Sequence, residues 1–209
     1  MFCAIAYVSM FLTRALPPII PSLPFLQYDP KDVIIVLGGF IFGPLSSLLV
    51  SVVVSLIEAI TVSDTGPIGL LMNVISTCAF ACTAALIYKK KRTLNGAVIG
   101  LVAGCVVMTG VMLLWNYAIT PMYMNVPREM IKDLLLPGFM PFNLIKGGLN
   151  TAFTLLLYKP LISALRAAKL VSASEVIPGK KKRVLPSVMI TVISLVLIAV
   201  LVVTIILLK

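Results

Sequence analysis

Apolar residues along this chain come in long runs, separated by short clusters of proline, glycine and charged residues. The runs predict helices over residues 2–16, 33–42, 45–61, 68–88, 94–119, 138–165 and 186–208. Several runs are about 20 residues long, the length that an α-helix needs to cross the hydrocarbon core of a bilayer. Backbone groups inside lipid must pair within their own segment, which favours helices. The pattern therefore predicts an all-α integral membrane protein.

Breaks between the runs divide the chain into three predicted units. Prolines end the first run, Gly43-Pro44 separates the second from the third, and a polar stretch at 127–136 could hold a surface helix. A polar segment then precedes the last run. The predicted units are a membrane domain over 1–168, a basic cytoplasmic linker over 169–185 and an additional transmembrane helix over 186–209.

Positive charge is concentrated at one predicted side of the membrane. The formal net charge is +10, and two basic clusters occur at 89–92 and 180–183. Basic loops stay in the cytoplasm, so the N-terminus is expected inside and the loops 22–32, 63–67 and 121–137 outside. This distribution argues against nucleic-acid binding and makes anionic membrane lipid the expected partner of these charges.

Lys146 is the most informative polar position, because it lies within a run that leads into an apolar helix. An ammonium inside a membrane-spanning helix costs about 2.5 kcal/mol or more, which marks it as a candidate functional residue. Asn143 lies three residues earlier, on the same helical face. The pair predicts a polar ligand site, and the alternative is that Lys146 extends to the outer headgroups.

Other polar outliers fall in the same predicted outer region. Asn73 and Asn116 lie near outer helix ends, and Tyr28 and Asp29 lie in an outer loop. The aromatic neighbours of Asn116 are also explained by an interfacial aromatic belt, whereas the asparagine is not. A further hypothesis pairs Arg14 with Glu58, which would lower the cost of burying each charge.

The residues needed for common catalytic chemistry are missing. The chain has no histidine and no phosphate-binding loop motif, and its four cysteines lie in apolar runs without metal-ligand spacing. The cysteines, and the pair Gly100 and Gly104, are explained by helix packing. We therefore expect a protein that is not an enzyme and holds no metal or cofactor.

Five short motifs carry a family resemblance. They are 25–32 (FLQYDPKD), 39–44 (GFIFGP), 65–69 (TGPIG) with Asn73, Asn116-Tyr117 with 121–123 (PMY), and 141–147 (PFNLIKG). In this order the chain resembles, over about 12–165, the riboflavin-binding S components of bacterial energy-coupling factor (ECF) vitamin transporters. The resemblance implies a six-helix bundle, to which the last predicted span adds a seventh helix. It also implies a riboflavin site at the outer face of the cell membrane, formed by Leu26, Tyr28, Asp29, Gly66, Asn73, Asn116, Asn143 and Lys146.

The resemblance further implies partners: a transmembrane coupling subunit and two cytoplasmic ATPases that drive delivery of riboflavin inward. Two departures stand out. The first helix lacks the Ala-xxx-Ala contact motif, since Ala4 is followed by Val8. Glu58 and Leu70 stand where relatives carry a basic residue and an acid. The alternatives are an S component for a related ligand, such as FMN or another vitamin, and a membrane scaffold without a transport role.

Overall fold

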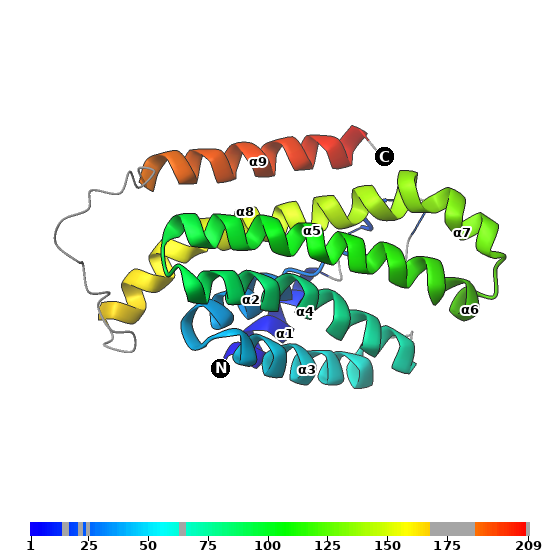
Figure 1. Ribbon diagram of the computed structural model, residues 1–209, viewed down its shortest axis with the longest axis horizontal. Coiled ribbons are helices and arrows are strands. Elements are labelled where there is room, and N and C mark those ends of the chain that lie inside the picture. The colour runs from blue at the N-terminus through cyan, green and yellow to red at the C-terminus, as the bar shows by residue number, and fades with distance from the viewer. Residues whose placement is uncertain (14–16, 21–22, 24–25, 63–65, 168–186, 208–209) are drawn as a thin grey trace.

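The computed structural model describes residues 1–13, 17–20, 23, 26–62, 66–167 and 187–207, and every regular element in these ranges is helical. The elements are α1 (Phe2–Thr13), α2 (Lys31–Phe42), α3 (Pro44–Thr61), α4 (Gly66–Lys90), α5 (Leu94–Ala118), α6 (Thr120–Met124), α7 (Arg128–Leu134), the π-helical η1 (Leu135–Phe139), α8 (Met140–Ala167) and α9 (Ser187–Leu207). The predicted all-α fold is confirmed. The long helices form a bundle, and α9 lies along one side of it against α8 (Figure 1).

Helix ends follow the predicted breaks, with two differences. Gly43 has a φ of 98° and separates α2 from α3, while Pro44 occupies the first turn of α3. However, α2 begins at Lys31 and not at the predicted Val33. A carboxylate in a first helical turn is stabilised by the helix dipole, and Asp32 occupies that place. A π-helical turn, η1, precedes α8 where a single helix was expected.

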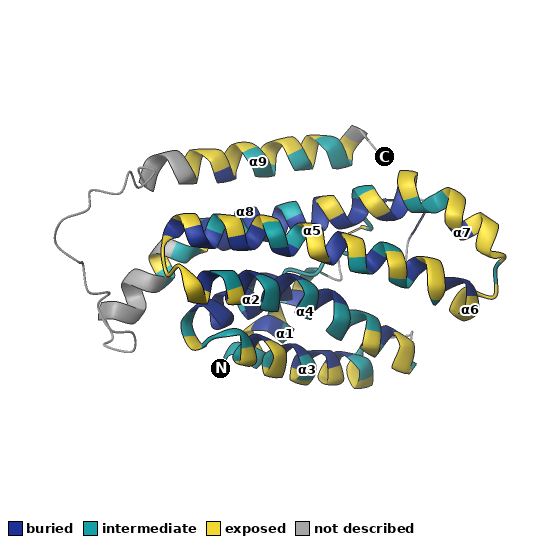
Figure 2. Cartoon of the chain, in the orientation of Figure 1, coloured by how far each residue is buried: buried dark blue, intermediate teal, exposed yellow. Residues whose placement is uncertain are grey.

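Three helices, α3, α4 and α5, are long and apolar enough to cross a bilayer, judged by length and composition over the described residues. Two shorter apolar helices are Phe2–Thr13 and Thr191–Ile206. The outward faces of α3, α5 and α9 carry many exposed residues (Figure 2), and large apolar side chains are common among them. Apolar residues on an outer surface of this extent suit contact with lipid. The predicted linker at 169–185 lies outside the described residues.

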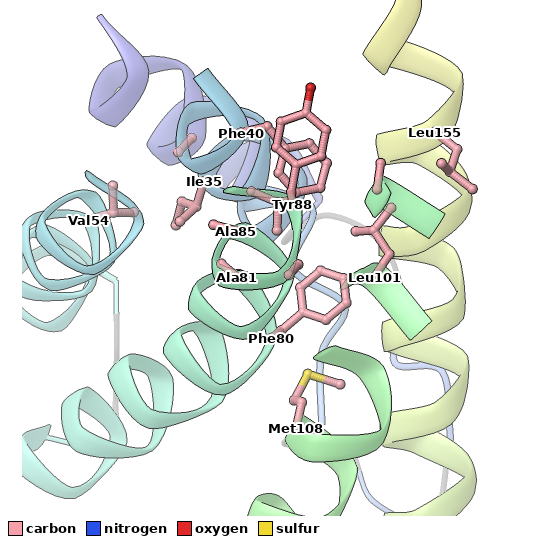
Figure 3. Packing of buried hydrophobic residues seen from close by; sticks show 14 of the residues in the cluster. Ile35, Phe40, Val54, Phe80, Ala81, Ala85, Tyr88, Leu101, Met108 and Leu155 are labelled. Carbon is pink, nitrogen blue, oxygen red and sulfur yellow. The ribbon is translucent and has the colours of Figure 1, made fainter. Parts of the chain in front are cut away.

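The larger apolar core joins α2, α4, α5 and α8. Phe40 of α2 stacks on Tyr88 of α4 with ring centroids 4.3 Å apart, and Phe80, Leu101 and Met108 continue the core along α4 and α5 (Figure 3). Such contacts fix the helices relative to one another, because protein interiors are close-packed. They hold in place the helices that carry the polar residues described below.

Close approach of α4 and α5 depends on glycine. A Cβ added at Gly100 would lie 2.7 Å from the carbonyl oxygen of Ala84, and one at Gly104 would lie 2.6 Å from that of Phe80. The predicted packing role of this glycine pair is confirmed. The four cysteines are half-buried free thiols within helices, in keeping with their predicted role as small packing residues.

A second apolar cluster forms around the N-terminal part of α8. Leu26 and Ile19, which precede α2, pack there with Phe142 and Ile145, and Ile131 of α7 closes the cluster. Leu201 and Ile205 of α9 pack against the same group. The predicted surface helix is therefore present as α7, and the additional C-terminal helix contacts the bundle where the segment before α2 meets α8.

Candidate functional site

Buried charged residues from three helices and one loop meet inside the bundle. Lys31, Asp32, Glu58 and Lys146 are each at most 5% exposed, and Asp29 lies beside them. A charged side chain buried at this level requires partners, because transfer of an ion out of water is costly. The partners are supplied by residues far apart in the sequence, so the cluster is a product of the tertiary fold.

Lys146 on α8 points into the cluster. Its ammonium nitrogen, Nζ, lies 3.3 Å from Oδ2 of Asp29 and 3.7 Å from Oδ2 of Asp32. The side chain is buried and paired, and thus does not extend to the outer headgroups. The ion pair with Asp29 joins the segment before α2 to α8.

Lys31 forms the other cationic centre of the cluster. Its ammonium donates to Oε2 of Glu58 on α3 and lies 3.9 Å from Oδ2 of Asp29. Glu58 thus has Lys31 as a partner in the structure, and the proposed partner Arg14 lies outside the described residues. A buried carboxylate next to an ammonium keeps its charge at a lower cost than an isolated one. Each of the two lysines in this cluster faces two carboxylates.

Asp32 connects three helices through its carboxylate. Oδ1 accepts a hydrogen bond of 2.7 Å from Oγ1 of Thr77 on α4, and Oδ2 accepts one of 3.2 Å from Nδ2 of Asn150 on α8. Oδ1 of Asn150 in turn accepts a 2.9 Å hydrogen bond from the hydroxyl of Tyr28. Burial raises the pKa of the Tyr28 phenol, and the charges of Asp32 and Asp29 raise it further. Tyr28 therefore stays a donor, and the segment before α2 is fastened to α8 twice.

The two asparagines predicted for the site are buried, each 2% exposed. Nδ2 of Asn143 donates to the carbonyl oxygen of Phe139, one turn earlier on the path into α8. Nδ2 of Asn116 donates to the carbonyl oxygen of Met112, and its Oδ1 accepts from Thr120. An amide group has two donor hydrogens and a carbonyl oxygen, so each retains capacity for a further polar partner.

The remaining predicted site residues lie apart from the charged cluster. Leu26 is buried in the second apolar cluster, close to α8. Gly66, at the start of α4, has a φ of 58°, which is a conformation that favours glycine, and Asn73 is half-buried on the same helix. Over the described residues, neither makes a hydrogen bond or ion pair with the cluster. Their contact with a ligand stays a prediction.

The aromatic neighbours of Asn116 differ in their surroundings. Trp115 packs partly against the larger core, while Tyr117 is 44% exposed. An exposed tyrosine near a helix end fits the interfacial belt. Only the asparagine of this triplet is fully buried.

Sequence reasoning missed the residues that hold the cluster together: Lys31, Asp32, Thr77 and Asn150. Lys31 and Asp32 were assigned to an outer loop, whereas both lie buried in the first turn of α2, which corrects that assignment. Asn150 could have been found, because it follows Lys146 by four residues and so shares its helical face. Thr77 carries no comparable signal in the sequence.

A cavity of about 290 Å³ lies where α8 and α9 meet the end of α1 and the segment before α2. It is lined by Leu149 and Phe153 of α8, by Ile198 of α9 and by largely apolar residues before α2, and Tyr28 is also among its lining residues. Asn116, Asn143 and Lys146 are not among its lining residues. Over the described residues, no group of three cysteines or acids is placed to hold a metal ion.

The sequence and the fold of this chain are similar to those of known proteins. The chain is 33% identical to "Riboflavin transporter RibU" of Staphylococcus aureus (strain TCH60), over 79% of this chain and 89% of that protein. It is 30% identical to "Riboflavin transporter FmnP" of Bacillus subtilis (strain 168), over 80% and 93% respectively. A solved structure described as "Structure and mechanism of the S component of a bacterial ECF transporter" superposes with a TM-score of 0.66 at 34% identity, covering 79% of this chain and 94% of that one.

A family model described as "ECF transporter, substrate-specific component" matches residues 1–158, which include α1 to α7 and most of α8. The matched residues contain the whole charged cluster and exclude α9. A transporter component of this kind is a membrane protein and not an enzyme, as the sequence predicted. The match covers more than half of the sequence, and this chain belongs to the family of ECF transporter substrate-specific components.

Proposed function

We propose that this chain binds riboflavin and delivers it across the cell membrane as the substrate-binding subunit of an ECF transporter. The proposal is supported by the names of the two relatives, both riboflavin transporters that align over about four-fifths of this chain. The single structural observation that carries it is the burial of three polar side chains, Lys146 and Asn143 on α8 and Asn116 on α5. These are polar groups fixed by the fold within an apolar helical bundle.

Riboflavin suits such a site chemically. Its ring system is flat and largely apolar, with carbonyl oxygens and ring nitrogens at the edge, and its ribityl chain carries hydroxyls. Small-molecule sites combine apolar walls with a few placed polar groups. In the proposed site Asn116, Asn143 and Lys146 hydrogen-bond the flavin, and Gly66 and Asn73 line the pocket. Leu26, Tyr28 and Asp29 cover it.

The proposed topology has six family helices and a seventh, α9. The N-terminus and the basic cluster at 89–92 lie in the cytoplasm, and the binding site opens to the outside. Residues 1–168 form the substrate-binding membrane domain, residues 169–185 form a linker in the cytoplasm, and residues 186–209 form the last transmembrane helix. The proposed partners are a transmembrane coupling subunit and two cytoplasmic ATPases. After replacement of the four native cysteines by serine, labelling of a cysteine introduced at Thr93 or at Asn125 in intact cells tests this orientation, with only Asn125→Cys expected to react from outside.

Two other functions remain as alternatives. The first is the same architecture with FMN or another vitamin as its ligand. The second is a membrane scaffold, for which α9 would be the essential part and Lys146→Ala would leave function intact. The burial of several polar side chains favours a ligand-binding subunit, because buried polar residues in membrane helices are costly without a functional role.

The deciding experiment is an absorption spectrum of the protein purified in mild detergent, followed by titration with riboflavin and measurement of fluorescence quenching. We expect a co-purified yellow chromophore or saturable binding. Lys146→Ala and Asn143→Ala should each weaken binding several-fold, because each removes a polar contact from a site shielded from water. Lys132→Ala, at an exposed position of α7, is the matched control.

Unchanged affinity in both Lys146→Ala and Asn143→Ala would contradict the site. A folded, monodisperse protein that binds neither riboflavin nor FMN would contradict the flavin function. Family membership and fold would stand in either case.

A further inference from the structure

Asp32 is a buried carboxylate for which the proposed binding step provides no role. It is 0% exposed and lies between α4 and α8. Thr77 donates a hydrogen bond to one carboxylate oxygen, and Asn150 donates to the other. Lys146 approaches that second oxygen at 3.7 Å. The carboxylate is thus held in one position by groups on two other helices, and it acts on the proposed site through Lys146 and Asn150.

The ammonium of Lys146 is shared between two carboxylates. Asp29 lies 3.3 Å from it on the side of the segment before α2, and Asp32 lies 3.7 Å away on the side of α4. At these separations opposite charges interact strongly in a medium of reduced dielectric constant. The lysine therefore offers hydrogen-bond donors to a ligand, while its positive charge is already balanced by the protein.

Among the described residues, the second lysine of the cluster is paired as well. Lys31 donates to Glu58 and also lies 3.9 Å from Asp29. A phosphate monoester brings a charge of about −1.5 to −2 at neutral pH. If the phosphate of a bound FMN came to lie beside these two lysines, each of which already faces two carboxylates, like charges would be close together in a buried site, which costs free energy.

We propose that Asp32 is a specificity-determining residue of this site, which positions Lys146 and balances its charge so that the site prefers an uncharged flavin to a flavin phosphate. The proposal rests on the proposed riboflavin function and deepens it. Asp32 is a positioning residue, since it acts through Lys146 and Asn150. Its negative charge disfavours the negatively charged phosphate of FMN, so the site selects riboflavin over FMN. Hydrogen bonds to the ring select flavins over other vitamins.

The test is the ratio of the dissociation constants of FMN and riboflavin, measured by quenching of flavin fluorescence in the full-length protein at low salt. The wild-type protein should bind riboflavin more tightly than FMN. Asp32→Asn keeps the shape of the side chain and removes its charge. We expect the ratio to shift toward FMN by roughly tenfold, because a unit charge about 8 Å from the phosphate of a bound FMN would be worth at least that at an effective dielectric constant near 20.

Three controls separate charge from structure. Asp32→Glu retains the charge and should retain the wild-type ratio. Thr77→Val removes a hydrogen bond to Asp32 without changing the charge, so both affinities should fall together. Asp133→Asn removes an exposed carboxylate of α7 and should leave both affinities unchanged, which excludes a general effect of net charge.

The outcomes are distinct. Wild-type binding of FMN as tight as that of riboflavin would overturn the proposal, as would an Asp32→Asn protein that loses both ligands equally. If Asp32→Asn does not yield monodisperse protein, Asp29→Asn removes the other carboxylate from Lys146. It should shift the ratio in the same direction, and an unchanged ratio would overturn the proposal. Absence of riboflavin binding in the wild type would instead contradict the proposed function.

Discussion

The ion pairs of Lys146 should make a large contribution to stability in the absence of any ligand. Lys146→Met keeps an unbranched side chain of similar length and removes the ammonium. Asp32, which is 0% exposed, then loses its cationic partner and retains only Thr77 and Asn150. Removing one partner of a buried ion pair lowers the free energy of unfolding by about 3–5 kcal/mol. Because Asp32 keeps two hydrogen bonds, we expect a loss near the lower figure.

A loss of about 3 kcal/mol lowers the ratio of folded to unfolded protein by roughly two orders of magnitude. It can be measured as the free energy of unfolding in a detergent titration with SDS, followed by the fluorescence of the single tryptophan, Trp115. The double variant Lys146→Met with Asp32→Asn removes both charges and should recover much of the loss. Lys132→Met, at an exposed position on α7, should leave the free energy of unfolding unchanged.

A loss below about 1 kcal/mol in Lys146→Met would refute this reasoning, since that is the value of an exposed ion pair. A double variant no more stable than the single variant would also refute it. In that case the cost would come from altered packing of the methionine and not from an unpaired carboxylate.

Three further predictions concern packing, the outer segment and the last helix. Gly104→Val should destabilise the protein by about 1–3 kcal/mol, because its new side chain meets the backbone of α4. Gly110→Val is the control, since Gly110 faces open space and the substitution should not destabilise the protein. Thermal unfolding in detergent compares the two variants, and equal effects would contradict the close approach of α4 and α5. Tyr28→Phe removes the hydrogen bond to Asn150, which is worth about 0.5–1.5 kcal/mol, and should therefore speed riboflavin release several-fold in stopped-flow fluorescence. An unchanged release rate would mean that this hydrogen bond does not hold the covering segment. Deleting 186–209 should leave equilibrium riboflavin binding intact, because the family match ends at residue 158; loss of binding in a correctly inserted, monodisperse truncation would show that α9 helps to form the site.

Much of the helical architecture could be predicted from the sequence. Apolar runs of sufficient length specify helices in lipid whatever their neighbours, and Gly43 and Pro44 stop them through backbone geometry that is local in origin. The importance of Lys146 was also visible, because an ammonium within an apolar run is costly in any arrangement of the helices.

The start of α2 shows where local reasoning failed. Lys31 and Asp32 are two adjacent charged residues after a proline, a pattern that favours an exposed loop. In the structure both are buried within the first turn of a helix. Their burial is tolerable only because Glu58, Lys146, Thr77 and Asn150 supply opposite charge and hydrogen bonds from other helices, which no local pattern records.

By itself the sequence determined the helices, the family and the residues whose polarity is out of place, since these depend on composition, spacing and short motifs. Only the tertiary structure decided which charges meet. Asp29 and Lys146 lie 117 positions apart, and their contact depends on how α2 and α8 pack together. The burial of Asp32 and the contact of α9 with α8 also depend on how whole helices pack together. Long-range electrostatic pairing follows from the packing of whole helices, and that packing is set by the apolar core that surrounds the cluster.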